Sequence, residues 1–422
     1  MRLGHLLKLA ARSAWNRRGT LCLIVLSVAL STMLLLGIER IRGQARESFA
    51  QSISGTDLIV GARGSGTQLM LYAIFHLGGA TNNMGWKSAE RLARHADVAW
   101  AVPLSLGDSH KGHPVIATTE DYFTRYAYRR GQHLRFAQGR AFAEIFDVVL
   151  GSETAKSLNY ALGVRITLSH GASGTGLTEH ADKPFTVVGI LSPTGTPIDR
   201  SLYISLPAME AIHLDWEGGA PIPGFRVTPE QVRKFNLEPK SVTALLLGLK
   251  SRGRVFALQR IIAADREEAL MAVLPGVALD ELWRMVNMGE QALLLISLLV
   301  MATGLAGLAS AILAGLGERR RELAILRSVG ACPEDILLLL SFEGLLVMLS
   351  GVVLGMLVLA ALMSAVAPAI ADACGILLYV SLPDSKEWLL VAGIMAAGFC
   401  ASLLPALRAY RMSLSDGLTL NT

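Results

Sequence analysis

The sequence predicts a membrane protein with four transmembrane α-helices and a large α+β domain, outside the membrane, inserted between helices 1 and 2. The 422 residues are 52% hydrophobic and only 17% charged, a balance typical of membrane proteins. Apolar runs long enough to cross a bilayer as helices occur at four places. They predict spans over 20–38, 290–316, 336–367 and 387–406, and the long stretch 39–289 contains no such run.

Lysine and arginine placement orients the four spans, because loops rich in these residues stay in the cytoplasm. The segments 1–19, 317–335 and 407–422 are basic, whereas the short loop 368–386 holds only Lys386 against two aspartates. Both termini and residues 317–335 are therefore expected in the cytoplasm, and 39–289 on the other side.

The leader, residues 1–19, has apolar residues at helical spacing between its basic ones. This pattern predicts an amphipathic helix on the inner membrane surface, although a basic tail without structure is an alternative. The following apolar run is too long for a signal peptide and ends without a small-residue cleavage site. We therefore interpret the first span as an uncleaved anchor.

The domain over 39–289 shows a mixture of strand and helix patterns. A strand that enters a glycine-rich turn is predicted over 55–67. Helices are predicted at 88–96, 152–158 and 254–271, and further strands at 115–119, 148–150, 165–168, 185–191, 202–206 and 241–249. No cysteine lies in this domain, which excludes a zinc ribbon or a dithiol redox motif.

Glycine spacing in this domain does not amount to a nucleotide site. Gly61 and Gly66 have the spacing of a P-loop, but Thr67 and Gln68 follow where lysine and serine or threonine are required. Without that lysine the phosphate contact is missing. We expect no ATP binding by the chain itself, no enzymatic activity and no cofactor bound directly.

Histidines in the domain offer only weak metal candidates. His110 and His113 lie three apart in a polar segment that we interpret as a solvated loop, and two ligands do not make a site. Further histidines are scattered through the domain, among them His76, His133, His170, His180 and His213. The sequence therefore predicts no metal centre, and no paired-carboxylate or Ser/His/Asp arrangement indicates catalysis.

Small residues recur at four-residue intervals within two spans. Ala302, Ala306 and Ser310 share one face of the second, and Gly351 and Gly355 form a GxxxG in the third. Such faces let helices approach closely. They predict either packing within the bundle or dimerisation, and the pattern does not decide between the two.

Between the second and third spans, residues 317–330 read GERRRELAILRSVG. The segment is too short to be a domain and too basic to cross the membrane. It is expected to be an interaction element at the cytoplasmic face. Leu323, Leu326 and Val329 lie at spacings that allow them to fill an apolar groove on a partner.

This segment closely resembles the signature of the FtsX-like permease family, as do 8–13 (KLAARS) and 404–408 (LPALR). The large domain resembles the periplasmic core domain of the MacB and LolC/LolE proteins at 139–142 (GRAF), 148–152 (VVLGS) and 185–190 (FTVVGI). The resemblance covers essentially the whole chain. It is specific in the basic segment and looser in the domain.

The resemblance implies a permease of a mechanotransmission-type ABC transporter in the bacterial inner membrane. A separate ATPase dimer would bind ATP and move a coupling helix, which contains Glu318, Arg319, Arg320, Arg321, Glu322, Leu323, Ile325, Leu326, Arg327, Val329 and Gly330. Other implied partners are a second permease copy or paralogue, a periplasmic or outer-membrane protein, and membrane lipids. No nucleic-acid partner is expected.

Two functions from different classes fit this resemblance. The first is export or extraction of lipoproteins, peptides or amphipathic molecules at the periplasmic face. The second is signalling, in which ATP-driven motion controls a periplasmic partner such as a cell-wall hydrolase. A third hypothesis, a metal-linked periplasmic function, depends on His110 and His113.

Overall fold

The computed structural model describes residues 18–52, 54–78, 82–129, 131–171, 180–217, 220–222, 224–318, 332–374 and 380–410. These residues form two compact units. The helical unit takes the described residues among Met1–Gln44, Val286–Pro368 and Leu378–Thr422. The α/β unit takes those among Ala45–Met285 and Ala369–Leu377.

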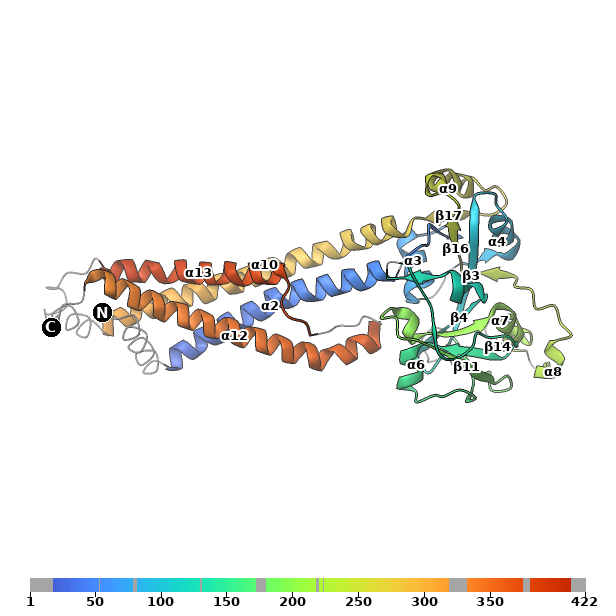
Figure 1. Cartoon of the computed structure of the whole chain (residues 1–422), viewed down its shortest axis with the longest axis horizontal. Helices are drawn as coiled ribbons and strands as arrows, with labels where there is room; N and C mark the ends of the chain where they lie inside the picture. The colour runs from blue at the N-terminus through green and yellow to red at the C-terminus, as the bar shows by residue number, and fades with distance from the viewer. Residues whose placement is uncertain are drawn as a thin grey trace. The chain divides into compact units, whose positions relative to one another are not determined.

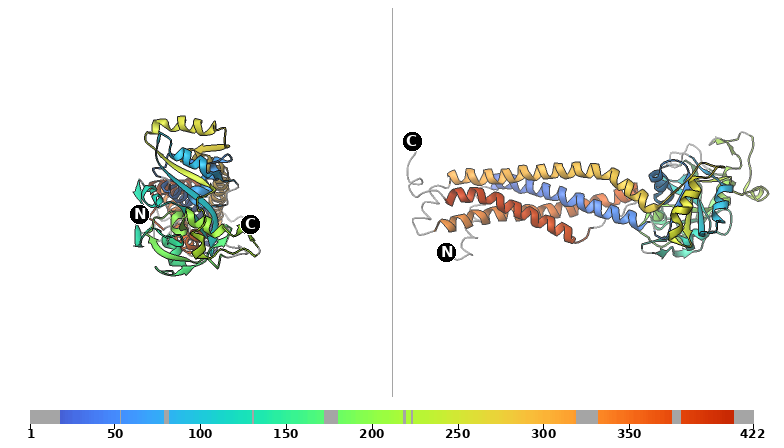
Figure 2. Two further views of the ribbon diagram at one scale, coloured as in Figure 1. Left: turned by 90° about the vertical axis from the view of Figure 1, so that its right-hand side faces the viewer. Right: turned by 90° about the horizontal axis from the view of Figure 1, so that it is seen from above.

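Four long helices lie side by side in the helical unit (Figure 2). They are α2 (Arg18–Gln51), α10 (Pro275–Glu318), α12 (Pro333–Cys374) and α13 (Ser385–Tyr410). Each contains a stretch that is long and apolar enough to cross a membrane. All four helices contribute to one apolar core, represented by Val28, Leu308, Met348 and Ile394. The helices extend beyond the apolar runs recognised in the sequence because helical geometry continues into polar turns.

An eleven-stranded mixed sheet forms the centre of the α/β unit (Figure 1). Its main path is β17 (Leu270–Val273), β1 (Leu58–Ala62), β16 (Ala244–Leu249), β3 (Val98–His110), β4 (His113–Thr118), β12 (Leu202–Ser205), β8 (Asp147–Leu150), β11 (Phe185–Leu191) and β7 (Phe136–Gly139). Off this path, β10 (Ser169–His170) pairs with β3, and β9 (Arg165–Ile166) pairs with β11. Most pairs are antiparallel, whereas β4 with β12 and β8 with β11 are parallel.

Side chains of the central strands alternate between two cores, one on each face of the sheet. In β12, Leu202 and Ile204 enter the first core and Tyr203 the second. The same alternation holds in β1, β8 and β16. It follows from the two-residue period of a strand, and it requires apolar residues in unbroken succession because both faces are covered.

Helices cover both faces. The first core takes side chains from α4 (Trp86–Ala93), α6 (Ser152–Ser157), α7 (Leu206–His213) and α9 (Val255–Ala263), and the second from α3 (Gly66–Phe75) and α5 (Asp121–Arg125). The remaining elements are peripheral: α8 (Pro229–Val232), the 3₁₀ turns η1 (Pro197–Arg200) and η2 (Arg252–Arg254), and the strand pairs β2 (Met84–Gly85) with β15 (Ser241–Val242), β5 (Ala127–Tyr128) with β6 (Gln132–His133), and β13 (Trp216–Glu217) with β14 (Ala220–Pro221).

Two local predictions differ from the structure in their bounds. The helix predicted over 254–271 ends at Ala263, because Asp265 Oδ1 accepts the backbone N–H groups of Glu267 and Glu268 and turns the chain. Strand β17 then follows at Leu270 and pairs with β1. The glycine-rich turn predicted up to Thr67 does follow β1, with bends at Arg63 and Gly64, but it is shorter than predicted. Helix α3 already begins at Gly66, where the Ser65 hydroxyl accepts the N–H of Gln68.

Candidate functional site

One aspartate and three histidines meet beside the end of strand β3 in the α/β unit. Asp108 lies in β3, and His170 lies directly opposite it in the antiparallel partner β10. Directly opposed residues place their side chains on the same face of a sheet. The Nδ1 atom of His170 is accordingly 3.1 Å from Oδ1 of Asp108.

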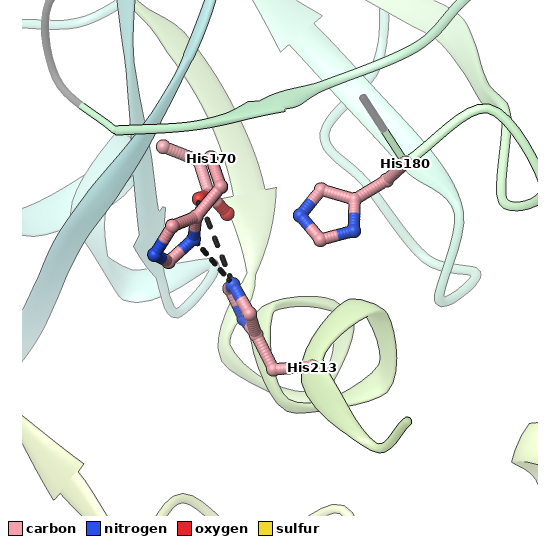
Figure 3. A group of neighbouring side chains, drawn as sticks. His170, His180 and His213 are labelled. Atoms are coloured by element: carbon pink, nitrogen blue, oxygen red, sulfur yellow. Dashed lines mark hydrogen bonds and ion pairs between the residues drawn. The ribbon is translucent and has the colours of Figure 1, made fainter. Parts of the chain in front are cut away.

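Helix α7 supplies the second histidine, His213, as its final residue. The helix begins where the Ser205 hydroxyl accepts the N–H of Ala208. Nε2 of His213 lies 3.1 Å from Nδ1 of His170 and 3.6 Å from Oδ1 of Asp108 (Figure 3). On the other side of the ring, Nδ1 lies 2.9 Å from the carbonyl oxygen of Met209 and donates to it. In the neutral ring this hydrogen bond leaves a lone pair on Nε2, which faces Asp108 and His170; in the protonated ring Nε2 also carries a proton and donates it to Asp108.

His180 completes the cluster from the segment that precedes β11. Its backbone N–H donates to the carbonyl of Leu168, and its ring faces the other two histidines (Figure 3). The ring is fully buried, with its centroid 4.2 Å from that of Trp216. Within the described part of the chain, neither ring nitrogen of His180 has a hydrogen-bond partner, and neither does Oδ2 of Asp108. Each such orphaned group costs about 1–3 kcal/mol.

Burial and mutual charge set the protonation of the cluster. Burial alone would raise the pKa of Asp108, but hydrogen bonds from His170 and His213 lower it to about 2. Burial lowers the pKa of His180 to about 4, against the attraction of Asp108. Burial also acts to lower the pKa of His213, but the hydrogen bond and charge of Asp108 outweigh it and raise that pKa. At neutral pH the cluster therefore combines an ionised carboxylate with a neutral His180.

A buried ion pair anchors the segment that carries His180. Lys183 is fully buried, and its Nζ atom lies 2.5 Å from Oδ1 of Asp215. The other carboxylate oxygen of Asp215 accepts the backbone N–H of Val227. Burial would raise the pKa of Asp215, but the hydrogen bond from Lys183 lowers it. Removing either partner would leave an uncompensated buried charge, so the pair holds this segment in place.

The solvated loop predicted at His110 and His113 is wrong. The two histidines flank the tight turn of the β3–β4 hairpin, where Lys111 and Gly112 both have positive φ. Both rings are buried. His110 contacts the Thr167 carbonyl and the Tyr160 hydroxyl, and His113 contacts the Arg200 carbonyl and the hydroxyls of Thr154 and Ser157. Among the described residues, neither histidine belongs to a cluster of three or more potential metal ligands. The four residues around Asp108 do form such a cluster.

The small residues of the helical unit divide into two sets. Gly351 and Gly355 of α12 lie against α2, where an added Cβ would come within 2.6 Å of Val28 Cγ1 and 2.5 Å of the Ala29 carbonyl oxygen, respectively. By contrast, Ala302, Ala306 and Ser310 of α10 are exposed, while Leu308 between them is buried in the core of the unit. The two glycines therefore pack within the chain, whereas no described residue covers the α10 face.

The coupling residues predicted from the sequence lie outside the described residues, apart from Glu318. Glu318 is the last residue of α10. Arg319, Arg320, Arg321, Glu322, Leu323, Ile325, Leu326, Arg327, Val329 and Gly330 fall in the gap before α12, as the amphipathic leader falls before α2.

A groove of about 820 Å³ opens on the α/β unit beside the start of α10. Its wall combines apolar side chains, including Phe256, Leu274 and Trp283, with the charged Arg46 and Asp280. Phe256 is 67% exposed, which is unusual for a large aromatic side chain. This mixture can accept a ligand that has an apolar and a charged part.

These features define a membrane-embedded helical unit joined to an α/β domain, and comparisons with known proteins specify the class. Residues 19–238 match the family described as MacB-like periplasmic core domain, and residues 294–414 match FtsX-like permease C-terminal. No curated protein matches the chain. The chain belongs to the FtsX-like permeases that carry a MacB-like periplasmic core domain. It is thus a member of an ABC transporter permease family of the inner membrane.

Two crystal structures resemble part of the chain. The periplasmic region of MacB from Actinobacillus actinomycetemcomitans has 13% identity and a TM-score of 0.33, with 56% of this chain and 93% of that chain covered. The extracellular domain of the ABC-type transporter YknZ from Gram-positive bacteria has 10% identity and a TM-score of 0.31, with 52% and 99% covered. With scores this low, the family assignment depends on the two sequence matches.

Proposed function

We propose that this permease works by mechanotransmission. A separate ATPase subunit hydrolyses ATP in the cytoplasm, and the motion passes along the helices to the periplasmic α/β domain. Both termini lie in the cytoplasm in this proposal. The permease itself binds no nucleotide and catalyses no reaction.

The course of helix α10 is the observation that carries this proposal. Its 44 residues begin in the α/β unit and end in the helical unit at Glu318, where the basic segment starts. At about 1.5 Å per residue such a helix is roughly 66 Å long, more than a bilayer requires. Because an unbroken helix resists bending, displacement of the basic segment by an ATPase would be felt at Pro275.

The cargo in this proposal is a lipoprotein, a peptide or another amphipathic molecule handled at the periplasmic face. The groove at Phe256 and Trp283 supports this class, because apolar and charged side chains line it together. A ligand bound there would contact the first turns of α10, which include Val277 and Asp280. Cargo binding and ATP-driven motion would therefore act on the same helix.

A single substitution in the basic segment tests the coupling. In the complex reconstituted with its ATPase, Leu326→Asp places a charge where an apolar groove is expected. We expect the permease-stimulated ATPase rate to fall to that of the ATPase alone, whereas the matched Leu326→Met should retain stimulation. If both variants stimulate the ATPase equally, Leu326 does not contact the ATPase as the coupling proposal requires.

The cargo proposal is tested with a fluorescent lipopeptide and the full-length permease in detergent. Phe256→Asp should weaken lipopeptide binding about tenfold, the effect of losing about 1.4 kcal/mol of apolar contact. Phe235 is 43% exposed and is not among the residues lining the groove, so Phe235→Asp serves as the control. No binding by the unmodified permease, together with specific recovery of a cell-wall hydrolase or its activator from cells, would favour the signalling function.

We also propose that a second permease copy or paralogue packs on the exposed face of α10 formed by Ala302, Ala306 and Ser310. Close helix approach requires small side chains of this kind. With the four native cysteines replaced by serine, Ser310→Cys should form a cross-linked dimer in membranes. Leu308→Cys, at a buried position of the same helix, should not. If Ser310→Cys yields no cross-linked product with either partner, this interface is wrong.

A further inference from the structure

We propose that Asp108, His170, His180 and His213 form a binding site for a divalent transition-metal ion of the zinc class. The site lies wholly within the α/β unit. It is independent of the coupling mechanism and of the cargo groove, with which it shares no residue.

Distances within the cluster suit one small ion. A tetrahedral Zn²⁺ site with bonds of about 2.0 Å separates its ligand atoms by about 3.3 Å. The His170–Asp108, His170–His213 and His213–Asp108 separations are 3.1, 3.1 and 3.6 Å. All four ligand atoms lie within 4.8 Å of one another, so His180 needs only a small rotation to reach the same ion.

His180 is the observation that distinguishes this cluster from an ordinary hydrogen-bonded network. Its ring is fully buried and points toward His170 and His213 (Figure 3). Neither ring nitrogen has a hydrogen-bond partner among the described residues. Buried polar groups are normally satisfied, and an ion in the cluster would accept the free lone pair of this ring.

The surroundings of the cluster also fit metal binding. A histidine that binds a metal through one ring nitrogen typically donates a hydrogen bond from the N–H of the other to a carbonyl or carboxylate. This hydrogen bond orients the binding nitrogen toward the metal. His213 does this through Met209. Asp108 supplies one negative charge, and the ammonium of nearby Lys183 is already paired with Asp215. The ion would therefore meet a net attractive site.

The donor set selects the kind of ion. Three imidazole nitrogens and one carboxylate oxygen suit Zn²⁺ and its transition-metal neighbours. Mg²⁺ and Ca²⁺ prefer coordination shells made of oxygen. Zn²⁺ is therefore the expected ligand, and neither Mg²⁺ nor Ca²⁺ should compete with it.

The test is a calorimetric titration: Zn²⁺ is added to metal-depleted, full-length permease in detergent, and the heat of binding is measured. The unmodified protein should bind one equivalent, and excess Mg²⁺ or Ca²⁺ should not displace it. His180→Gln and His213→Gln should each weaken binding by at least about a hundredfold. His133→Gln, which alters an exposed histidine outside the cluster, should bind like the unmodified protein.

Co²⁺ provides a second readout that reports ligand geometry. Bound at the cluster it should show the intense visible absorption of a tetrahedral ion, which His180→Gln removes. Thermal unfolding of each variant without metal shows whether the domain remains folded. No one-equivalent Zn²⁺ binding by the unmodified protein, or undiminished binding by folded His180→Gln and His213→Gln, would overturn the proposal.

Discussion

Arg40 of α2 and Glu387 of α13 form a buried ion pair that joins the first and last helices of the helical unit. Their side chains are only 8% and 7% exposed. Nε of Arg40 lies 2.8 Å from Oε1 of Glu387, and Nη2 lies 2.5 Å from Oε2. This two-bonded geometry matches the planar guanidinium to the carboxylate. Because the residues are 347 positions apart, the pair fixes a long-range contact.

Arg40→Ala or Glu387→Ala should each destabilise the permease by about 3 kcal/mol, because the remaining charge is left buried and unpaired. The double substitution should cost less than the sum of the two. Detergent unfolding monitored by fluorescence measures these changes. Arg42→Ala is the control, because Arg42 is 35% exposed where it pairs with Glu290, and its loss should cost less than about 1 kcal/mol. Equal losses of stability for Arg40→Ala and Arg42→Ala would show that the buried pair of Arg40 and Glu387 does not have this role.

Gly355→Ala should destabilise the helical unit by about 1–3 kcal/mol through overpacking. The added Cβ would lie 2.5 Å from the Ala29 carbonyl oxygen and 2.9 Å from Thr32 Cβ, so α2 and α12 must separate. Gly393→Ala, in α13, meets nothing within 4 Å and should be neutral or mildly stabilising, since alanine favours helix more than glycine. The same unfolding assay compares them, and a smaller loss at Gly355 than at Gly393 would refute the packing.

The α/β unit should lose stability as pH falls below 6.5, partly through His76. Burial lowers the pKa of the His76 ring to about 3, and its Nδ1 lies 2.8 Å from the Ser201 hydroxyl oxygen. Since the unfolded chain takes up this proton near pH 6.5 and the folded chain does not, protonation favours unfolding. The stability that the folded protein gains by keeping His76 neutral is fully present above pH 6.5 and is lost progressively as the pH falls toward 3.

Comparison with His76→Asn isolates this contribution. Asparagine cannot take up the proton, and it tolerates the left-handed backbone at this position, where φ is 53°. From pH 7 to pH 5 the unmodified protein should lose about 2 kcal/mol more unfolding free energy than this variant. His133→Asn, at an exposed position, should retain the pH dependence of the unmodified protein. Identical pH profiles for the unmodified protein and His76→Asn would exclude the effect.

Strands of the α/β unit could be predicted where local pattern and burial agree. The strand predicted over 185–191 coincides with β11, whose residues alternate in burial. Strand β3 was not predicted. Its first part, residues 98–104, is a continuous apolar run, but Pro103 and Gly107 are residue types that strands normally disfavour. They fit here because the first part of the strand pairs with β16 and the second with β4.

The histidine cluster could not be predicted from spacing. His170 and Asp108 are 62 residues apart, and His170 and His213 are 43 apart. Only the pairing of β10 with β3 and the packing of α7 bring them together, and neither contact leaves a local motif. The short spacing of His110 and His113, by contrast, belongs to a hairpin turn.

Strand β1 forms near the beginning of the α/β unit, yet both of its neighbours, β16 and β17, come from the end. During synthesis, Leu58–Ala62 therefore has no strand to pair with until the chain has been made through Leu249, and its second neighbour is complete only at Val273. Contacts of such sequence separation form late, and an apolar strand that waits for its partners is prone to associate with other chains. Biogenesis of this permease should accordingly demand a chaperone for the nascent periplasmic segment more than for the helices that anchor it.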